Sequence, residues 1–240
     1  MLPLWIQFAL SKEYQAKTKM DFNLKFGFPG IIGAIDCTHV AIATPNDTQD
    51  YQSFIYMNRK SFYSINVQLI CDVNMRILNI NAKYPGSTHG AFIWRHSAIR
   101  NALLVNNEAC SWLIGDAGYP LEPWLMTPIS NADEDSPSAR YNDAHTRARN
   151  TIERCNGLIK SKFRCCQRSR QLHYSPEKAG LIINACAILH NICIHYNVRH
   201  FPIEELEEDI AWGPIPHDNC TNSLRDKAVA LRNSLIMTRF

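Results

Sequence analysis

The sequence predicts an α/β fold in which helices flank a mixed sheet. Short runs of strand-forming residues occur at 31–35, 62–71 and 111–115. In the second half of the chain the apolar residues recur at helical spacing instead. The elements follow in the order strands, a helix, a further strand and then helices, which is typical of a sheet covered by helices.

The start of the chain predicts a short helical lead-in over residues 1–27. It ends at the turn-rich stretch 27–30, where two glycines flank Phe-Pro. The apolar run 31–35 follows at once and ends on Asp36. Its length and its branched residues are typical of a buried strand.

A hairpin is predicted next. The strand at 62–71 runs into a turn at 72–75, and a returning strand covers 76–82. Asp72 is explained as a residue of this turn, and a role as a fourth metal ligand is the alternative.

A helix and a further strand follow the hairpin. The helix fits residues 89–105 and places Phe92, Ile99 and Leu103 on one face. The strand at 111–115 is short and apolar, and it too runs into an aspartate, Asp116.

Residues 117–139 carry four prolines and are expected to be irregular. The helix that follows has an apolar stripe formed by Ile152, Cys155, Ile159, Phe163 and Cys166. After about residue 198 the chain becomes an acidic tail, with one more helix expected from Leu224 to Met237. We therefore divide the chain into a lead-in at 1–27, a main domain at 28–197 and a tail at 198–240.

Ser175 and Pro176 predict the start of a further helix, as N-cap and first helical residue. The apolar residues of this helix are Leu181, Ile182, Ala185, Ile188, Leu189 and Ile192. It also carries His190, Cys193 and His195, which superficially suggest a metal site. Because this spacing spreads the side chains over about 180° of the helix, core packing is the favoured interpretation.

Composition supports a folded chain and sets limits on its class. Hydrophobic residues make up 46% of the sequence, enough for a core, so disorder throughout is not expected. No secretory signal and no run of 18 apolar residues occur, so we expect no membrane span. The nine cysteines are expected to be reduced, and the lack of any CxxC pair argues against zinc.

Charge is unevenly distributed, although the formal net charge is only +3. Between Arg140 and Arg170 there are nine Lys or Arg residues against two acids. Residues 204–209 are the reverse, with acids at five of six positions. A concentrated basic stretch can neutralise phosphates, which points to a nucleic acid; a solvated helix face is the alternative.

Three carboxylates are candidates for one site. Asp36 and Asp116 each follow a predicted strand, and Glu153 lies on the basic helix. Such side chains can converge at the crevice of an α/β sheet, where they need a cation to ionise together. Carboxylates and a phosphate substrate suit Mg²⁺, and two such ions can cleave a phosphodiester. Taken singly, each aspartate is better explained as an ordinary turn or cap residue.

Five blocks strengthen the argument for this site. They are GFPGIIGAIDCTHVAI, YMNRKSFYSINVQLICD, YPGSTHGAFIW, SWLIGDAGYP and NTIERCNGLIKSKFRC, and the similarity continues through SPEKAGLIINACAILHNI. In this order they resemble the conserved blocks of Harbinger transposases, especially the Harbinger transposase-derived nucleases of animals, over roughly 28–197. The resemblance implies an RNase H-like fold and a DDE site that binds Mg²⁺ or Mn²⁺. The matching residues are Asp36 before Cys-Thr-His, Asp116 in GDAGY and Glu153 in IER.

Two departures from the family stand out. The family has an aspartate after the histidine of PGSxH, whereas this chain has Gly90 after His89. If that aspartate supports the metal site, its loss questions activity. Family members also carry an N-terminal helix-turn-helix region that 27 residues cannot hold, so we expect a truncated chain or a lost module.

The expected function is metal-dependent hydrolysis of DNA. The alternative is an inactive transposase derivative that binds DNA or protein. The resemblance further implies a nuclear location and a separate Myb-like DNA-binding protein as partner. The candidate DNA contacts are Arg149, Arg154, Lys160, Arg59, Lys60 and His39.

Overall fold

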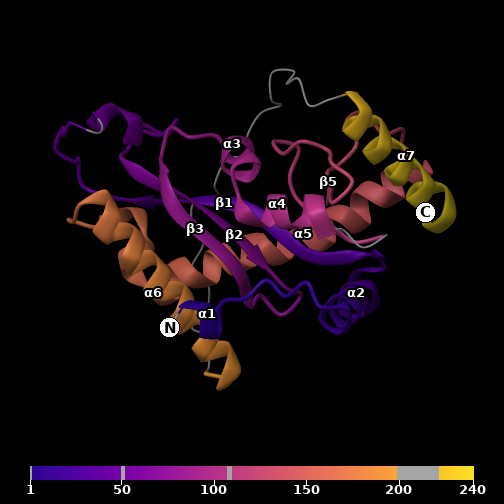
Figure 1. Cartoon of the computed structure of the whole chain (residues 1–240), viewed down its shortest axis with the longest axis horizontal. Helices are drawn as coiled ribbons and strands as arrows, with labels where there is room; N and C mark the ends of the chain where they lie inside the picture. The colour runs from indigo at the N-terminus through magenta and orange to yellow at the C-terminus, as the bar shows by residue number, and fades with distance from the viewer. Residues whose placement is uncertain (1, 50–51, 107–109, 199–221) are drawn as a thin grey trace.

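The computed structural model describes residues 2–49, 52–106, 110–198 and 222–240 (Figure 1). Its centre is a five-stranded sheet in the order β3-β2-β1-β4-β5. The strands are β1 (Ile31–Ala41), β2 (Ser64–Cys71), β3 (Ile77–Pro85), β4 (Trp112–Ile114) and β5 (Leu125–Met126). The first three strands are antiparallel neighbours, whereas β4 and β5 run parallel to β1. This is the mixed sheet of the predicted RNase H-like α/β fold.

Seven α-helices surround the sheet in the described part of the chain. They are α1 (Leu2–Trp5), α2 (Lys12–Phe26), α3 (Gly90–Arg95), α4 (Ala98–Asn106), α5 (Pro137–Lys162), α6 (Pro176–His195) and α7 (Asn222–Arg239). Three short 3-10 helices are η1 (Ser53–Tyr56), η2 (Arg164–Cys166) and η3 (Arg168–Arg170). Ser175 caps α6 as predicted, and Ser136 caps α5 in the same way, each followed by a proline.

The two faces of the sheet bury separate hydrophobic clusters. In one, Ala34 of β1 packs with Ile152 of α5 and Ile183 of α6. In the other, the next residue, Ile35, packs with Trp94 of α3. Because side chains alternate along a strand, β1 separates an α5 face from an α3 face. Figure 1 shows α3 and α4 in front of the strands and α5 crossing behind them.

The hairpin turn forms as predicted. Asp72 Oδ1 accepts hydrogen bonds from the backbone N–H groups of Asn74, at 2.8 Å, and of Arg76, at 2.9 Å. Met75 closes the turn with a positive φ of 63°. Asp72 is thus a turn residue, as interpreted from the sequence.

Three local predictions were wrong. The first strand does not end at Asp36 but continues to Ala41, because β2 pairs with it as far as Ser64. The helix predicted over 89–105 is two helices, α3 and α4, and Phe92 is 45% exposed instead of facing the core. The stretch 117–139 contains the short strand β5, whose two residues are too few to leave a periodic pattern.

The apolar helix α6 packs on β3. Among the described helices, α6 alone is long and apolar enough to cross a membrane. A helix in the core of a folded domain can have the same length and composition. The predicted apolar stripe of α6 is partly wrong, because Leu181 and Leu189 are exposed. The buried face is instead formed by Ala179, Ile183, Cys186, Ala187, His190 and Asn191. Asn191 binds the backbone N–H and C=O of Ile77, which fixes α6 to β3.

The final helix, α7, lies in the stretch assigned to the tail and packs against α5. Leu235 and Ile236 are buried in the same cluster as the core of α5. The ring of Phe240 contacts the rings of Phe28 and Tyr141, with centroids 5.5 and 5.8 Å away.

Candidate functional site

The first predicted ligand, Asp36, lies in the middle of β1. It is in the row of Ala34, so its side chain is on the α5 face of the sheet. Asn156 of α5 donates from Nδ2 to Asp36 Oδ2 at 3.1 Å. This bond joins two residues 120 positions apart and places α5 over Asp36.

The second ligand, Asp116, lies just beyond β4 and is 6% exposed. Ala34 and Ile114 are partners in the parallel ladder between β1 and β4. Asp36 and Asp116 therefore each lie two residues beyond a paired position, at neighbouring points of one sheet edge. Asp116 Oδ1 also accepts the backbone N–H of Gly118 at 2.9 Å, which orders the loop after the strand.

The third ligand, Glu153, lies on α5 one turn before Asn156. Its Oε1 accepts a charge-assisted hydrogen bond from Arg149 Nη2 at 2.6 Å, and its side chain is 45% exposed. In the described ranges, Asp36, Asp116 and Glu153 do not form a group whose carboxylate oxygens all lie within 4.8 Å of one another. Mutual repulsion of three anions and the ion pair of Glu153 with Arg149 both oppose closer approach.

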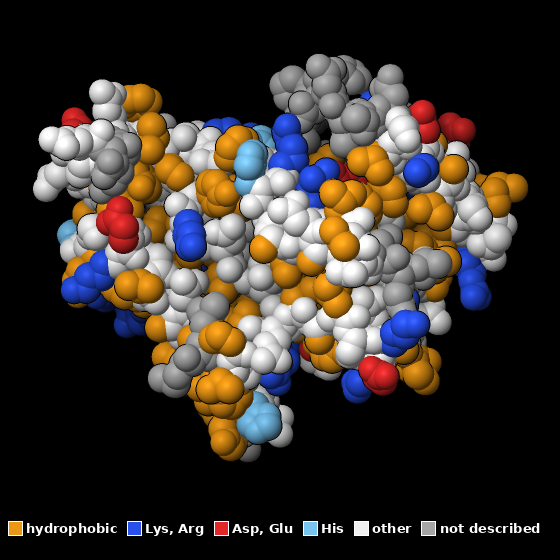
Figure 2. Space-filling model, in the orientation of Figure 1, with side chains coloured by type: hydrophobic (Ala, Val, Ile, Leu, Met, Phe, Trp, Pro, Cys, Tyr) orange, Lys and Arg blue, Asp and Glu red, His pale blue; other side chains and the backbone are white. Residues whose placement is uncertain are grey.

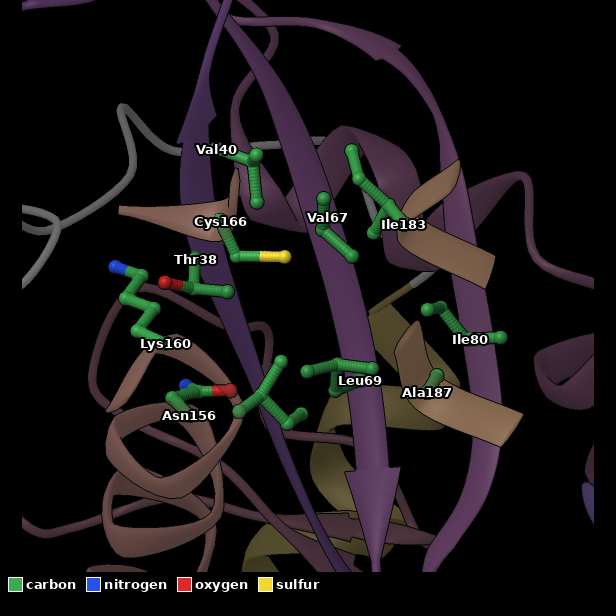
Figure 3. A pocket seen from close by; sticks show the side chains of 11 residues that line it. Thr38, Val40, Val67, Leu69, Ile80, Asn156, Lys160, Cys166, Ile183 and Ala187 are labelled. Atoms are coloured by element: carbon green, nitrogen blue, oxygen red, sulfur yellow. The ribbon is translucent and has the colours of Figure 1, made fainter. Parts of the chain in front are cut away.

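The residues present fit a hard divalent cation. The three predicted ligands all offer carboxylate oxygens, the donors that Mg²⁺ and Mn²⁺ prefer. Asn156 adds an amide oxygen, Oδ1, which is buried and accepts no hydrogen bond in the described structure. Figure 3 shows Asn156 and Lys160 of α5 opposite Thr38 of β1, at the polar side of a pocket otherwise lined mainly by apolar residues.

The opposite face of β1 carries a buried polar group. Cys37 Sγ and Tyr119 Oη lie 3.3 Å apart, and Gln68 Nε2 is 3.4 Å from the same oxygen. Burial raises the pKa of Tyr119, and the nearby Cys37, Asp36 and Asp116 raise that pKa further. The hydroxyl therefore stays protonated beside the two carboxylates.

Gly90, which replaces the family aspartate, packs against this polar group. A Cβ at Gly90 would lie 3.1 Å from Cys37 Sγ and 3.5 Å from Tyr119 Oη. The family aspartate therefore corresponds to a position on the α3 face of β1, whereas Asp36 is on the α5 face.

The candidate DNA contacts occupy several places. Arg154 is exposed on α5, whereas Lys160, further along the same helix, is only partly exposed and lines the pocket. Arg59 and Lys60 lie between η1 and β2, away from α5 in the chain. On the face of the molecule in Figure 2, Lys and Arg side chains are dispersed and form no single basic patch.

His39 lies on the side of β1 opposite Asp36, since the two are three residues apart in one strand. Its Nδ1 is 3.0 Å from Ser64 Oγ, and its ring meets the edge of Phe62. This location separates His39 from the face on which Asp36 lies.

The motif His190-x-x-Cys193-x-His195 does not converge on one point in the described structure. Nε2 of His190 is 2.8 Å from the carbonyl oxygen of Met75, in the β2–β3 turn. His195 stacks edge-on against Trp5 of α1. The two histidines therefore pack against different segments. His190 is buried, as the core interpretation predicts, whereas His195 is exposed.

Sequence reasoning missed several residues. No sequence pattern marked Asn156 as part of the site, although it lies one helical turn beyond Glu153. Glu122 is fully buried, pairs with Arg100 at 2.7 Å and accepts hydrogen bonds from two indole N–H groups. It fixes the loop after Asp116 to α3 and α4. Three cysteines, Cys165, Cys166 and Cys186, also come together, although no CxxC spacing marks them.

Comparison with known proteins places this site in a family. Residues 35–191, more than half of the chain, match the family described as "DDE superfamily endonuclease". No solved structure matches the chain.

Curated relatives extend the similarity over nearly the whole chain. The human protein named "Putative nuclease HARBI1" is 34% identical over 237 residues, and its rat counterpart is 32% identical over the same length. In both cases the alignment covers 98% of this chain but 66% of the relative, so the chain spans just under two thirds of their length. "Protein ALP1-like" of Arabidopsis thaliana is 26% identical over 191 residues, covering 73% of this chain and 46% of that protein. The chain therefore belongs to the DDE superfamily endonuclease family, among the Harbinger transposase-derived proteins.

Proposed function

We propose that this protein is a divalent-metal-dependent nuclease that hydrolyses phosphodiester bonds of DNA. The observation that carries the proposal is the arrangement of Asp36 and Asp116 at one sheet edge, with α5 held over Asp36 by Asn156. The same helix carries Glu153 and six of the nine Lys or Arg residues that lie between Arg140 and Arg170.

Asp36, Asp116 and Glu153 would hold one or two Mg²⁺ or Mn²⁺ ions. When bound, these ions would activate water and neutralise charge that develops on the phosphate. Arg149 orients Glu153 through its ion pair, and the Gly118 N–H orients Asp116. The basic side chains along α5 would bind DNA phosphates and so orient the scissile bond, while base contacts or a partner protein would supply specificity.

A plasmid-nicking assay with Mg²⁺ or Mn²⁺ tests the proposal. Asp116→Asn keeps the size of the side chain and removes its charge, so cleavage should fall by roughly a hundredfold or more. Asp143→Asn, an exposed acid on α5, is the matched control and should cleave like the wild type. Equal cleavage by Asp116→Asn and wild type would assign the activity to another site or to a contaminant.

Gly90 favours a second candidate, an inactive derivative that still binds DNA or protein. If this alternative holds, the protein binds a labelled DNA duplex and retards it in a gel, but does not nick the plasmid with either Mg²⁺ or Mn²⁺. Gly90→Asp would then restore cleavage if the missing carboxylate is the cause. Cleavage by the wild type at a rate abolished by Asp116→Asn would exclude this candidate.

A further inference from the structure

A group of three cysteines includes none of the three predicted carboxylate ligands, although one of them, Cys166, lines the same pocket as Asn156 (Figure 3). Cys165 and Cys166 belong to η2, just after α5, and Cys186 faces them from α6. One sulfur from each lies within 4.8 Å of the other two. Cys166 and Cys186 are buried, and Cys165 is partly exposed.

The distance between two of these sulfurs matches shared coordination of a metal. Cys165 Sγ and Cys186 Sγ are 3.7 Å apart. Zinc–sulfur bonds are about 2.3 Å, so two thiolates on one tetrahedral zinc lie roughly 3.8 Å apart. A disulfide would need the same atoms about 2.05 Å apart, so no disulfide joins them in this arrangement. The described positions thus favour a shared ion over a direct sulfur–sulfur bond.

The chemistry of the group differs from that of the carboxylate site. Thiolates are soft ligands that select zinc and other thiophilic ions, whereas Mg²⁺ prefers oxygen. The stretch from Lys160 to Arg170 carries five Lys or Arg residues and no acid, which compensates the charge of several thiolates.

We propose that Cys165, Cys166 and Cys186 form a three-thiolate site for Zn²⁺. The fourth coordination position is on the side of the partly exposed Cys165, where water or an external ligand completes the tetrahedron. Binding releases the thiol protons to solvent and changes no oxidation state. The ion joins η2, at the end of α5, to α6, so it fastens the helix that carries Glu153 to the helix on β3.

Cobalt is the probe, because thiolate ligands give Co²⁺ an intense near-ultraviolet charge-transfer band that carboxylates do not give. The reduced, metal-free full chain is titrated with Co²⁺, and then with Zn²⁺ to displace it. We expect one equivalent of Co²⁺ to produce the band and one equivalent of Zn²⁺ to remove it. Zn²⁺ should also raise the Tm of the wild type, since an ion that binds only the folded state stabilises it.

Two variants and one control locate the site. Cys186→Ser and Cys165→Ser should each weaken the band strongly and lose the zinc-dependent rise in Tm, and Cys165→Ser alters the less buried residue if Cys186→Ser folds poorly. Cys193→Ser removes a thiol two turns further along α6 and should behave like the wild type. Absence of the band in the reduced wild type, or its survival in Cys165→Ser, would overturn the proposal. A Cys165–Cys186 disulfide in protein purified under reducing conditions would overturn it as well.

Discussion

At the scale of single residues, each predicted ligand is held by a group that is not itself one of the three predicted ligands. Asn156 binds Asp36, and Arg149 binds Glu153. Asp116 is held by the backbone N–H of Gly118. Such second contacts orient a metal ligand, so variants of these neighbours should affect a site that they do not themselves form.

The two arginines nearest Glu153 should differ in their effect on DNA affinity. Arg149 shares the face of Glu153, whereas Arg154, the next residue after Glu153, points about 100° away around α5. If DNA lies along the Glu153 face, Arg149→Ala should lower the slope of log affinity against log salt by about one, and Arg154→Ala by less. A salt titration of both variants on one duplex, followed by fluorescence anisotropy, measures this.

Two other results of that titration are informative. A larger loss for Arg154→Ala would place DNA on the other side of α5. If neither variant changed the slope, the basic run would be a solvated surface. The ion pair of Arg149 with half-exposed Glu153 is expected to contribute little to stability, so both variants should remain folded.

At the scale of elements, α5 connects the site to the core. Its buried side includes Tyr141, His145 and Ile152, and its other side carries Glu153. Tyr141 donates its hydroxyl proton to the carbonyl oxygen of Thr127 at 3.0 Å, and Nε2 of His145 is 3.3 Å from that of Met126 in β5. The position of Glu153 therefore depends on how firmly α5 packs on this edge of the sheet.

His145 should make the stability of this packing depend on pH. Burial lowers the pKa of His145 from 6.5 to about 4, although the hydrogen bond to the Met126 carbonyl acts to raise it. The unfolded chain therefore binds the proton more readily, and stability is fully present above pH 6.5 and falls as the pH drops from 6.5 towards 4. The shift corresponds to at most about 3 kcal/mol.

The measurement is urea denaturation across that range of pH. His145→Gln should flatten the decline relative to the wild type, whatever its effect at neutral pH. His173→Gln, which changes an exposed histidine, should keep the wild-type slope. A His145→Gln curve parallel to that of the wild type at every pH would show that His145 does not titrate on unfolding.

At the scale of the whole molecule, segments from both ends of the chain share one core. Phe28, Ile31 and Tyr141 pack in the same cluster as Leu235 and Ile236 of α7. The assignment of 198–240 as a separate tail remains a prediction, but the described helix within it contributes to this core. The alignment covers 66% of the human relative, and the Myb-like partner and nuclear location implied by the family resemblance remain predictions for this chain.

Truncation of α7 side chains should therefore destabilise the whole domain. Ile236→Ala should cost about 2–5 kcal/mol of unfolding free energy, because it leaves a cavity at a residue that is 5% exposed. The matched control is Met237→Ala, whose side chain is 81% exposed and should cost less than about 0.5 kcal/mol. Denaturation followed by both circular dichroism and tryptophan fluorescence tests this, and a separate early transition for α7 would contradict it.

The sequence by itself determined the features that depend on neighbouring residues. Branched apolar runs located the strands, Ser175-Pro176 located the start of α6, and the ordered motifs selected Asp36, Asp116 and Glu153. These signals are readable because backbone preference and hydrophobic period are local properties of the chain. They located most of the elements and selected the candidate ligands, but they missed β5 and the break between α3 and α4.

Only the tertiary structure decided how these elements meet. Periodicity gives the spacing of a stripe but not its partner, so it could not predict the bond of Asn156 to Asp36 across 120 positions. It also could not place Gly90 against Cys37 on the opposite face of β1. The three cysteines form one group for the same reason: the packing of η2 on α6, and no spacing within the sequence, brings their sulfurs together.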